Sequence, residues 1–241
     1  MNFLIKNWGF LRHSVALDLK KPTGDYLFRL FRYFTIEWDS KEKYKIAFDQ
    51  CKLNQDSTLL EIGFGQGVGL RMARKLMFPE LFRFTLKKNL NRGKIIGIDI
   101  SEYAVRRAKI QNISLIVKGY VDIHKISVDH IPLLNHSVDY VIHIDSFYFW
   151  ADLDEALSEI WEKLKPEGKI ITVFNPKQIA DARNIKLLVY SRPDFLAYTV
   201  SLERNGFNNV TWNRFGNIEC ITAEKPSILR IASQEDGELD K

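Results

Sequence analysis

The sequence predicts an α/β fold in which a mostly parallel sheet is covered by helices on both faces. From Ser57 onward, short apolar runs alternate with helix-like segments, which is typical of parallel strands joined by helices. A glycine-rich turn directly follows the first apolar run. Near the end of the chain, two strand-like runs are separated by a short turn, as in an antiparallel hairpin.

The elements of the central region follow from their hydrophobic patterns. Parallel strands are expected at Thr58–Gly63, Lys94–Asp99, Ser114–Gly119, Val138–Ile144 and Lys169–Phe174. Helices are expected at Val68–Leu76, at a segment capped by Ser101 that runs to about Asn112, and at Asp152–Leu164. Pro166 and Gly168 are expected to end the last of these helices.

The two ends of the chain differ from this alternating region. After a helix at Asp194–Asn205, which stops at Gly206, strands are expected at Phe207–Trp212 and Ile218–Ala223, with a turn at Asn213–Asn217. Residues 1–56 are expected to form a helical extension or cap, 57–225 the main domain and 226–241 a flexible acidic tail. The extension carries an apolar helical stripe at Tyr26, Leu27, Leu30, Phe31, Phe34 and Trp38. This stripe fits a docked helix, a membrane-interface helix or a lid over a ligand.

Length and composition exclude several classes of protein. The chain has 241 residues, of which 46% are hydrophobic and 27% charged, as in ordinary globular domains. Two cysteines, Cys51 and Cys220, cannot form a disulfide framework, and no Cys/His cluster has the spacing of a metal site. No apolar run is long enough to span a membrane, and Met1–His13 is a poor signal peptide. We therefore expect a cytoplasmic protein without a metal, while the basic, apolar start leaves an organelle open.

Positive charge is concentrated in one stretch. Between residues 71 and 94 a single acid, Glu80, accompanies eight basic residues, Arg71, Arg74, Lys75, Arg83, Lys87, Lys88, Arg92 and Lys94. Such a run suits contact with phosphates or an anionic membrane surface, and it equally suits a solvated helix face followed by a loop.

The glycine loop at residues 63–67 is the strongest functional signal. Leu59-Leu60-Glu61-Ile62-Gly63-Phe64-Gly65-Gln66-Gly67 runs from a strand into a helix, and its glycines allow a sharp turn against which a ligand can lie. A dinucleotide loop would have a third glycine at position 68, which is Val68. Glu61 before the loop would repel a pyrophosphate and attract a cationic ligand. Asp99, at the end of the next strand, suits ribose hydroxyls, or else the start of the following helix.

Five motifs in this order resemble the class I S-adenosylmethionine-dependent methyltransferases, specifically the small-molecule type called methyltransferase domain 11. They are Leu59–Gly67, Ile98–Ser101, Asn135–Val141, Ala156–Gly168 and Asn205-Gly206-Phe207. Lys21-Pro22-Thr23-Gly24 is similar to an element that precedes the core in some bacterial members. The resemblance implies a doubly wound, mostly parallel, seven-stranded Rossmann-like sheet with an antiparallel last strand, and a site above the strand ends.

The resemblance also implies a set of residues that bind S-adenosylmethionine. Glu61 would lie near the methionine amino group, and Gly63, Phe64, Gly65 and Gly67 would cradle the methionine part. Asp99 would hold the ribose hydroxyls, and Ile100 would pack on the adenine. The remaining residues of the expected cofactor group are Tyr120, Val121, Asp122 and His143.

The chain departs from the family at two positions. Gly119-Tyr120-Val121 corresponds to the Gly-Asp-Ala that ends the third strand in the family, so Tyr120 replaces the acid that meets the adenine amine, and Asp122 is the expected substitute. The basic residues 79–94 replace a short loop and form an expected insertion over the sheet edge or the pocket rim.

Candidate catalytic residues follow the fourth strand. Transfer of a sulfonium methyl group is an in-line displacement, so a base is needed only where the acceptor must lose a proton. His143, Asp145 and Tyr148 are the candidates, with His143 either a base that titrates near neutral pH or a core histidine. The aromatic run Phe147–Trp150 fits a wall around a planar or apolar acceptor, or simple packing. Asp145–Tyr148 has the order of the Asp-Pro-Pro-Tyr of amino-directed nucleic-acid methyltransferases without its prolines.

Four functional hypotheses follow. The leading one is methyl transfer from S-adenosylmethionine to a small-molecule acceptor, which leaves S-adenosylhomocysteine as product. The second is methyl transfer to RNA or protein through the basic stretch 71–94. The third is a catalytically silent, cofactor-binding scaffold, suggested by Tyr120, and the fourth a nicotinamide-dependent oxidoreductase, disfavoured by Val68 and the terminal hairpin. The acceptor atom and the oligomeric state have no signal in the sequence.

Overall fold

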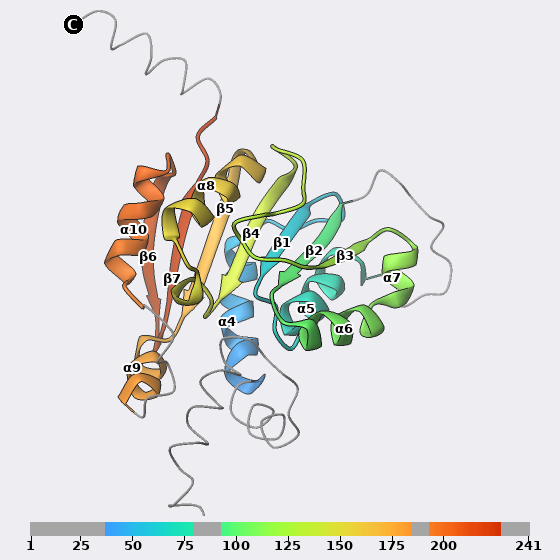
Figure 1. Ribbon diagram of the computed structural model, residues 1–241, viewed down its shortest axis with the longest axis horizontal. Helices are drawn as coiled ribbons and strands as arrows, with labels where there is room; N and C mark the ends of the chain where they lie inside the picture. The colour runs from blue at the N-terminus through green and yellow to red at the C-terminus, as the bar shows by residue number, and fades with distance from the viewer. Residues whose placement is uncertain (1–36, 80–92, 185–192, 228–241) are drawn as a thin grey trace, which may run out of the picture.

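The computed structural model describes residues 37–79, 93–184 and 193–227 and confirms the α/β fold (Figure 1). In the described part of the chain one sheet has seven strands: β1 (Thr58–Ile62), β2 (Lys94–Asp99), β3 (Val121–Lys125), β4 (Val138–Ile144), β5 (Leu164–Phe174), β6 (Asn208–Phe215) and β7 (Ile218–Glu224). The helices are α4 (Glu37–Gln50), α5 (Val68–Met77), α6 (Glu102–Gln111), α7 (Ile113–Val117), α8 (Leu153–Lys163), α9 (Pro176–Asn184) and α10 (Phe195–Arg204). A 3-10 turn, η2, spans Phe147–Phe149.

The strand order β3-β2-β1-β4-β5-β7-β6 creates a switch point beside β1. The chain first builds the sheet outward from β1 through β2 to β3, and then returns to add β4 and β5 on the other side of β1. All five of these strands run parallel, and β7 is antiparallel to both β5 and β6. In such sheets a ligand-binding crevice forms where the helices connected to neighbouring strands diverge, which is here the edge beyond the ends of β1 and β4.

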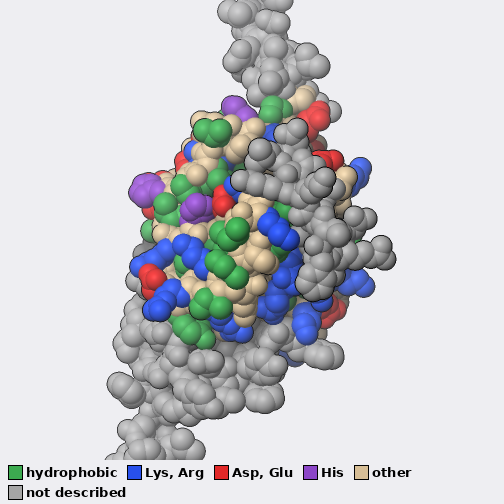
Figure 2. All heavy atoms as spheres, turned by 90° about the vertical axis from the view of Figure 1, so that its right-hand side faces the viewer, with side chains coloured by type: hydrophobic (Ala, Val, Ile, Leu, Met, Phe, Trp, Pro, Cys, Tyr) green, Lys and Arg blue, Asp and Glu red, His purple; other side chains and the backbone are tan. Residues whose placement is uncertain are grey.

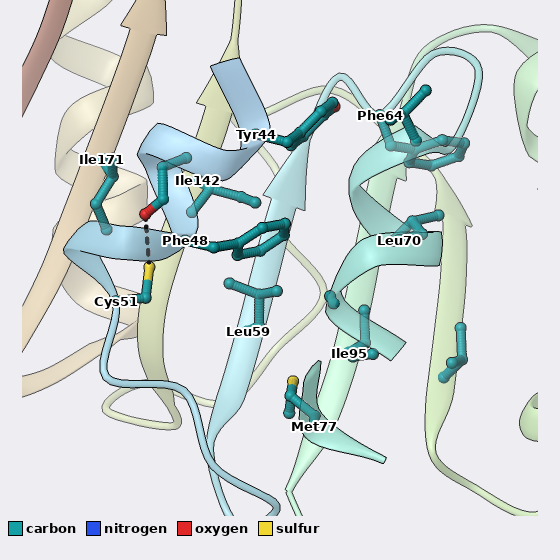
Figure 3. Packing of buried hydrophobic residues seen from close by; sticks show 14 of the residues in the cluster. Tyr44, Phe48, Cys51, Leu59, Phe64, Leu70, Met77, Ile95, Ile142 and Ile171 are labelled. Carbon is teal, nitrogen blue, oxygen red and sulfur yellow. Dashed lines mark hydrogen bonds between the residues drawn. The ribbon is translucent and has the colours of Figure 1, made fainter. Parts of the chain in front are cut away.

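Two hydrophobic cores lie on opposite faces of the sheet. Successive residues of β1 alternate between them, so that Leu59 packs with α4 and α5 while Leu60 packs with α8 and α10. Figure 3 shows the first core, where Phe48 of α4 lies beside Leu59 and Leu70 of α5 lies near Ile95. The Cys51 thiol donates to the Ala47 carbonyl at 3.3 Å, and Cys220 is likewise a buried free cysteine.

Helix α4 was not predicted as a separate element, although its sequence carries the signal. Tyr44, Ala47, Phe48 and Cys51 recur at i, i+3, i+4 and i+7 and are all buried. Through this face α4 packs against α5, β4 and β5, which brings its upper turn to the ends of β1 and β4.

The prediction of a strand at Ser114–Gly119 is wrong. These residues largely form α7, in which Leu115 is buried while Ile113 and Val117 are exposed, and Gly119 ends the turn with a φ of 78°. The third strand is instead Val121–Lys125, whose alternating buried and half-buried residues suit the edge of a sheet. A short apolar run does not distinguish a helix from a buried strand, and the polar Asp122 and His124 weaken the true strand signal.

Two boundaries in the C-terminal part also differ from expectation. The chain passes from α8 directly into β5 at Leu164, with an irregularity near Glu167, whose φ is 66°. The hairpin turn is confined to Gly216–Asn217, so β6 and β7 are longer than predicted. Asp139, from the third family-like motif, ties the opposite end of the sheet together, because it accepts hydrogen bonds from the Thr58 backbone and the Lys165 ammonium.

Several expectations fall outside the described residues. They concern the apolar stripe from Tyr26 to Phe34, most of the basic residues 79–94 and the acidic tail. Among the helices that the structure describes, none is long and apolar enough to cross a bilayer.

Candidate functional site

The glycine loop lies where β1 ends and α5 begins. Gly63, Gly65 and Gly67 all have positive φ angles, of 71°, 47° and 69°, which residues with a Cβ rarely adopt. A Cβ on Gly63 would lie 3.1 Å from the Cβ of Ser146, so this glycine keeps the loop clear of the end of β4. The Phe64 ring is 2% exposed and packs against Gly97, so Phe64 contributes only its backbone to the surface of the loop.

Asp99 joins the glycine loop to the end of β2. Its Oδ2 accepts from the Gly65 backbone N–H at 2.8 Å, and its Oδ1 accepts from the Ser101 backbone N–H at 2.8 Å. The N-cap of α6 is Ser101 itself, whose hydroxyl accepts from the Ala104 N–H. Ile100, next to Asp99, is 37% exposed at the same edge. Asp99, Ile100 and the glycine loop are therefore together, as the sequence predicted.

Glu61 is a fully buried acid directly below the loop. Its Oε1 accepts a very short hydrogen bond from the Tyr44 hydroxyl of α4. Burial raises the pKa of Glu61 to about 8, partly offset by the hydrogen bond from Tyr44 and the charge of Arg71. Among the described residues, no group hydrogen-bonds to Oε2. The acid before the loop thus has one oxygen held and one without a partner.

Asp145 follows β4 in a strained conformation, with a φ of 50°. Its Oδ2 lies 2.6 Å from the ammonium of Lys43, a residue of α4 whose side chain is only 3% exposed. The same ammonium donates to Gln178 Oε1 of α9 at 3.0 Å. Burial and the neighbouring Asp145, which accepts a hydrogen bond from the phenol, raise the pKa of Tyr148 well above its ordinary value. Asp145 and Tyr148, two of the candidate residues, are therefore adjacent, and α4 and α9 contact Asp145 through Lys43.

His143 is a core residue. It is fully buried, and its Nε2 lies 2.8 Å from both the Tyr198 hydroxyl and the Thr172 hydroxyl, with Trp150 packed on the ring at 4.7 Å between centroids. Burial lowers the pKa of His143 to about 3, so the imidazole is neutral. The prediction of a base that titrates near neutral pH is therefore wrong, as is that of a cofactor contact, because the ring lies in the core between the sheet and α10.

The structure does not place Tyr120, Val121 and Asp122 beside Asp99, as the adenine contacts predicted for them require. Gly119 and Tyr120 precede β3, and Val121 is its first residue. These residues therefore lie at the start of the parallel strands, whereas Asp99 lies at the end of β2. Tyr120 is buried against Phe78, at 4.9 Å between ring centroids, and Asp122 pairs with Lys94 at 2.5 Å. The segment that does follow β3 beside Asp99 begins at Ile126, whose N–H donates to the Asp99 carbonyl.

Sequence reasoning missed the residues that support the site from other segments. Lys43, Tyr44 and Gln178 come from helices before and after the motifs, and no local pattern marks their role. Gln66 within the loop accepts hydrogen bonds from two arginines. Arg71 donates to the Gln66 backbone carbonyl, and Arg107 donates to the Gln66 side-chain oxygen. Among the residues that the structure describes, no cluster of three or more His, Cys, Asp or Glu side chains could hold a metal ion.

The end of the molecule formed by α6 and α7 is partly hydrophobic at its surface. Figure 2 shows hydrophobic side chains there beside Lys and Arg side chains. The exposed aliphatic residues of these two helices are Ile110, Ile113 and Val117.

Comparison with known proteins finds similarity to one family. Residues 60–172, which hold most of β1, the glycine loop, Asp99 and the end of β4, match the family model described as methyltransferase domain. The seven-stranded sheet is that of the Rossmann-like methyltransferase fold. The uncharacterized methyltransferase YdaC of Bacillus subtilis is 27% identical over 193 residues, which are 75% of this chain and 90% of that protein.

Solved structures show the same fold. A putative methyltransferase from Haloferax volcanii, solved in complex with the Trm112 methyltransferase activator, has a TM-score of 0.66 at 17% identity and covers 81% of this chain and 94% of that one. Geranyl diphosphate C-methyltransferase from Streptomyces coelicolor, solved with geranyl diphosphate and S-adenosyl-L-homocysteine, has a TM-score of 0.60 at 12% identity, with coverages of 84% and 87%.

Proposed function

We propose that the chain transfers a methyl group from S-adenosylmethionine to a small-molecule acceptor bound at the edge between β1 and β4. The observation that carries this proposal is the link between Asp99 Oδ2 and the Gly65 N–H, which holds a side-chain-free loop and a carboxylate together at the switch point. The fold alone would leave the chemistry open, so the proposal depends on these residues.

The residues at this edge fit the cofactor. The positive φ angles of Gly63, Gly65 and Gly67 present a backbone without side chains, which suits the methionine part. The two oxygens of Asp99 accept one N–H each, and a carboxylate has further lone pairs for two ribose hydroxyls. Glu61 has an unpartnered buried oxygen that suits the ammonium group. Ile100 is exposed enough to cover one face of the adenine.

When bound, the cofactor supplies a methyl group that is already electrophilic. This chain's residues therefore need mainly to align the acceptor and exclude water. The Asp145 carboxylate, held by Lys43 and by the Tyr148 hydroxyl, is the group best suited to accept a hydrogen bond from an acceptor N–H or O–H. Tyr148 acts through Asp145, because burial keeps the phenol protonated and the pKa high. His143 is assigned no part, because its ring is fully buried and burial lowers its pKa to about 3, which makes it a weak base.

The small-molecule class of acceptor is supported by the contacts on the acceptor side and by the neighbours. Lys43 links α4 to Asp145 at the end of β4 and to Gln178 of α9 by hydrogen bonds. One structural neighbour acts on geranyl diphosphate, as its name states. Transfer to RNA or protein, and a silent scaffold, are the alternative outcomes of the experiment below.

The test has two parts. Calorimetric titration of the full chain with S-adenosylmethionine should show binding, and its absence would end the proposal. The protein is then incubated with methyl-labelled cofactor and separate metabolite, RNA and protein fractions of a cell extract. Label in the metabolite fraction is the expected result. Label in RNA or protein would replace the acceptor class, and binding without any transfer would indicate a scaffold.

A further inference from the structure

Three carboxylates converge on one buried tyrosine of α4. Glu61 hydrogen-bonds to the Tyr44 hydroxyl, and the charges of Glu61, Asp145 and Asp99 all raise the Tyr44 pKa, after burial itself. Tyr44 is 5% exposed and packs beside Phe48 midway along α4 (Figure 3). Glu61 contacts the Tyr44 hydroxyl directly, while Asp145 and Asp99 act on it through their charge alone.

A glycine within α5 makes room for this contact. Gly69 is the second residue of α5 and is buried against α4 and β1. A Cβ at Gly69 would lie 2.3 Å from a ring carbon of Tyr44 and 2.4 Å from Glu61 Oε1. No real Cβ approaches so closely, so α5 can pack here only because residue 69 has no side chain. Two helices and a strand are thus fitted around the Tyr44–Glu61 pair.

The second oxygen of Glu61 is left without a partner inside this arrangement. Oε2 has no hydrogen bond among the described residues, although Glu61 is fully buried. A buried, unsatisfied carboxyl oxygen is costly unless a ligand group pairs with it. The groups that face Glu61 are Tyr44 of α4, Arg71 and the Leu70 backbone N–H of α5, and Asp99 of β2. Among these, Asp99 and Arg71 act on Glu61 with opposite signs, while the Tyr44 hydroxyl favours its ionised form.

We propose that Tyr44 is a positioning residue which holds Glu61 for the amino group of the bound cofactor, and that Glu61 releases its proton when that ammonium binds. This inference rests on the proposed function, because it needs the cofactor to occupy the edge beside Gly65 and Asp99. The proton balance is simple. The carboxylic acid of the free protein loses H⁺ to solvent, and the resulting carboxylate pairs with the ligand ammonium while Tyr44 keeps its own proton.

The consequence is a measurable exchange of protons. Burial raises the pKa of Glu61 to about 8 in the free protein, so the acid is mostly protonated at pH 7. Pairing with an ammonium reverses this preference, because an opposite charge favours the ionised carboxylate. Binding at pH 7 should therefore release close to one proton.

The test is calorimetric titration of the full chain with S-adenosylhomocysteine at pH 7, in two buffers with different ionisation enthalpies. 5′-Methylthioadenosine, which has no amino acid part, is the matched control ligand. The wild type should release close to one proton with the first ligand and none with the second. Wild-type binding of S-adenosylhomocysteine without proton release would overturn the proposal, and this measurement needs no variant.

Two variants separate the roles of the pair. Tyr44→Phe should weaken S-adenosylhomocysteine about fivefold to tenfold, the effect of losing one hydrogen bond to a charged group. The affinity for 5′-methylthioadenosine should not change. A merely structural defect would lower the affinity for both ligands alike, and that result would contradict the proposal. Glu61→Gln should bind S-adenosylhomocysteine more weakly and without the released proton. If neither ligand binds the wild type, the proposed function fails instead.

Discussion

The two halves of the candidate site are built in different ways. On the β1–β2 side, a backbone loop and one carboxylate do the holding, and all of it comes from residues 58–101, a continuous stretch. On the β4 side, Asp145 is held by side chains from α4 and by its neighbour Tyr148, and Gln178 of α9 adds a further contact. Residues 43, 145 and 178 are far apart in the sequence and meet only in the folded chain.

The two halves differ in how a substitution would change them. The backbone conformation of Gly63–Gly67 depends on glycines at three positions, so most substitutions there would disturb the loop against which a ligand can lie. A corner made of side chains can be rebuilt by changing single residues. We expect the first half to define the cofactor and the second half to define the acceptor.

The largest expected effect concerns the backbone half. Asp99→Ala should weaken S-adenosylmethionine by more than about 100-fold, because two hydrogen bonds to a charged group are lost together with the tie to Gly65. Isothermal titration measures the change in affinity. Asp122→Ala is the matched control, since Asp122 lies at the other end of the sheet and pairs with Lys94. Equal losses in the two variants would break the assignment of the site to this edge.

The contrast between the halves also shows what the sequence could predict. The glycine loop, Asp99 and Ser101 were predicted because short-range backbone rules govern them. Tyr120 and Asp122 were misassigned because the Ile113–Val117 helix resembles a strand in its composition, and this error moved the third strand by several residues. Lys43 and Tyr44 could not be assigned a role from the sequence. Lys43 contacts Asp145, 102 residues later, and Tyr44 contacts Glu61, 17 residues later.

A second prediction concerns stability behind the β4 half. His143 has a pKa of about 3 in the folded protein and an ordinary value of 6.5 when unfolded, so the unfolded chain takes up the proton first as the pH falls. The free energy of unfolding should therefore fall below pH 6.5 by about 1.4 kcal/mol per pH unit, or about 2 kcal/mol at pH 5. Urea unfolding at pH 7 and pH 5 measures this loss.

The matched variant for this prediction is His143→Gln, which cannot titrate. Its difference in unfolding free energy between pH 7 and pH 5 should be smaller than that of the wild type by the same amount, about 2 kcal/mol. The same pH dependence in both proteins would show that His143 has the same pKa in the folded and unfolded states, and the base that we have excluded would return as a candidate.

The third prediction tests the side-chain half directly. Lys43→Met keeps the buried aliphatic stem and removes the ammonium that orients Asp145. We expect affinity for S-adenosylmethionine to stay within about threefold, while methyl transfer into the metabolite fraction falls about tenfold or more through misalignment. Lys43→Arg should restore part of the transfer. A loss of cofactor binding as large as the loss of transfer would mean that the two halves are not separable.

The smallest effect is expected at Tyr148, which reaches the acceptor side only through Asp145. Tyr148→Phe removes one hydroxyl that donates to Asp145 and keeps the buried ring, so transfer should fall about threefold to fivefold with cofactor affinity unchanged. The pH dependence of transfer near neutrality should be the same as in the wild type, because burial keeps this phenol protonated there. A new dependence on pH in the variant would instead make Tyr148 a proton donor or acceptor, and Asp145 would then lose its role as the group that orients the acceptor.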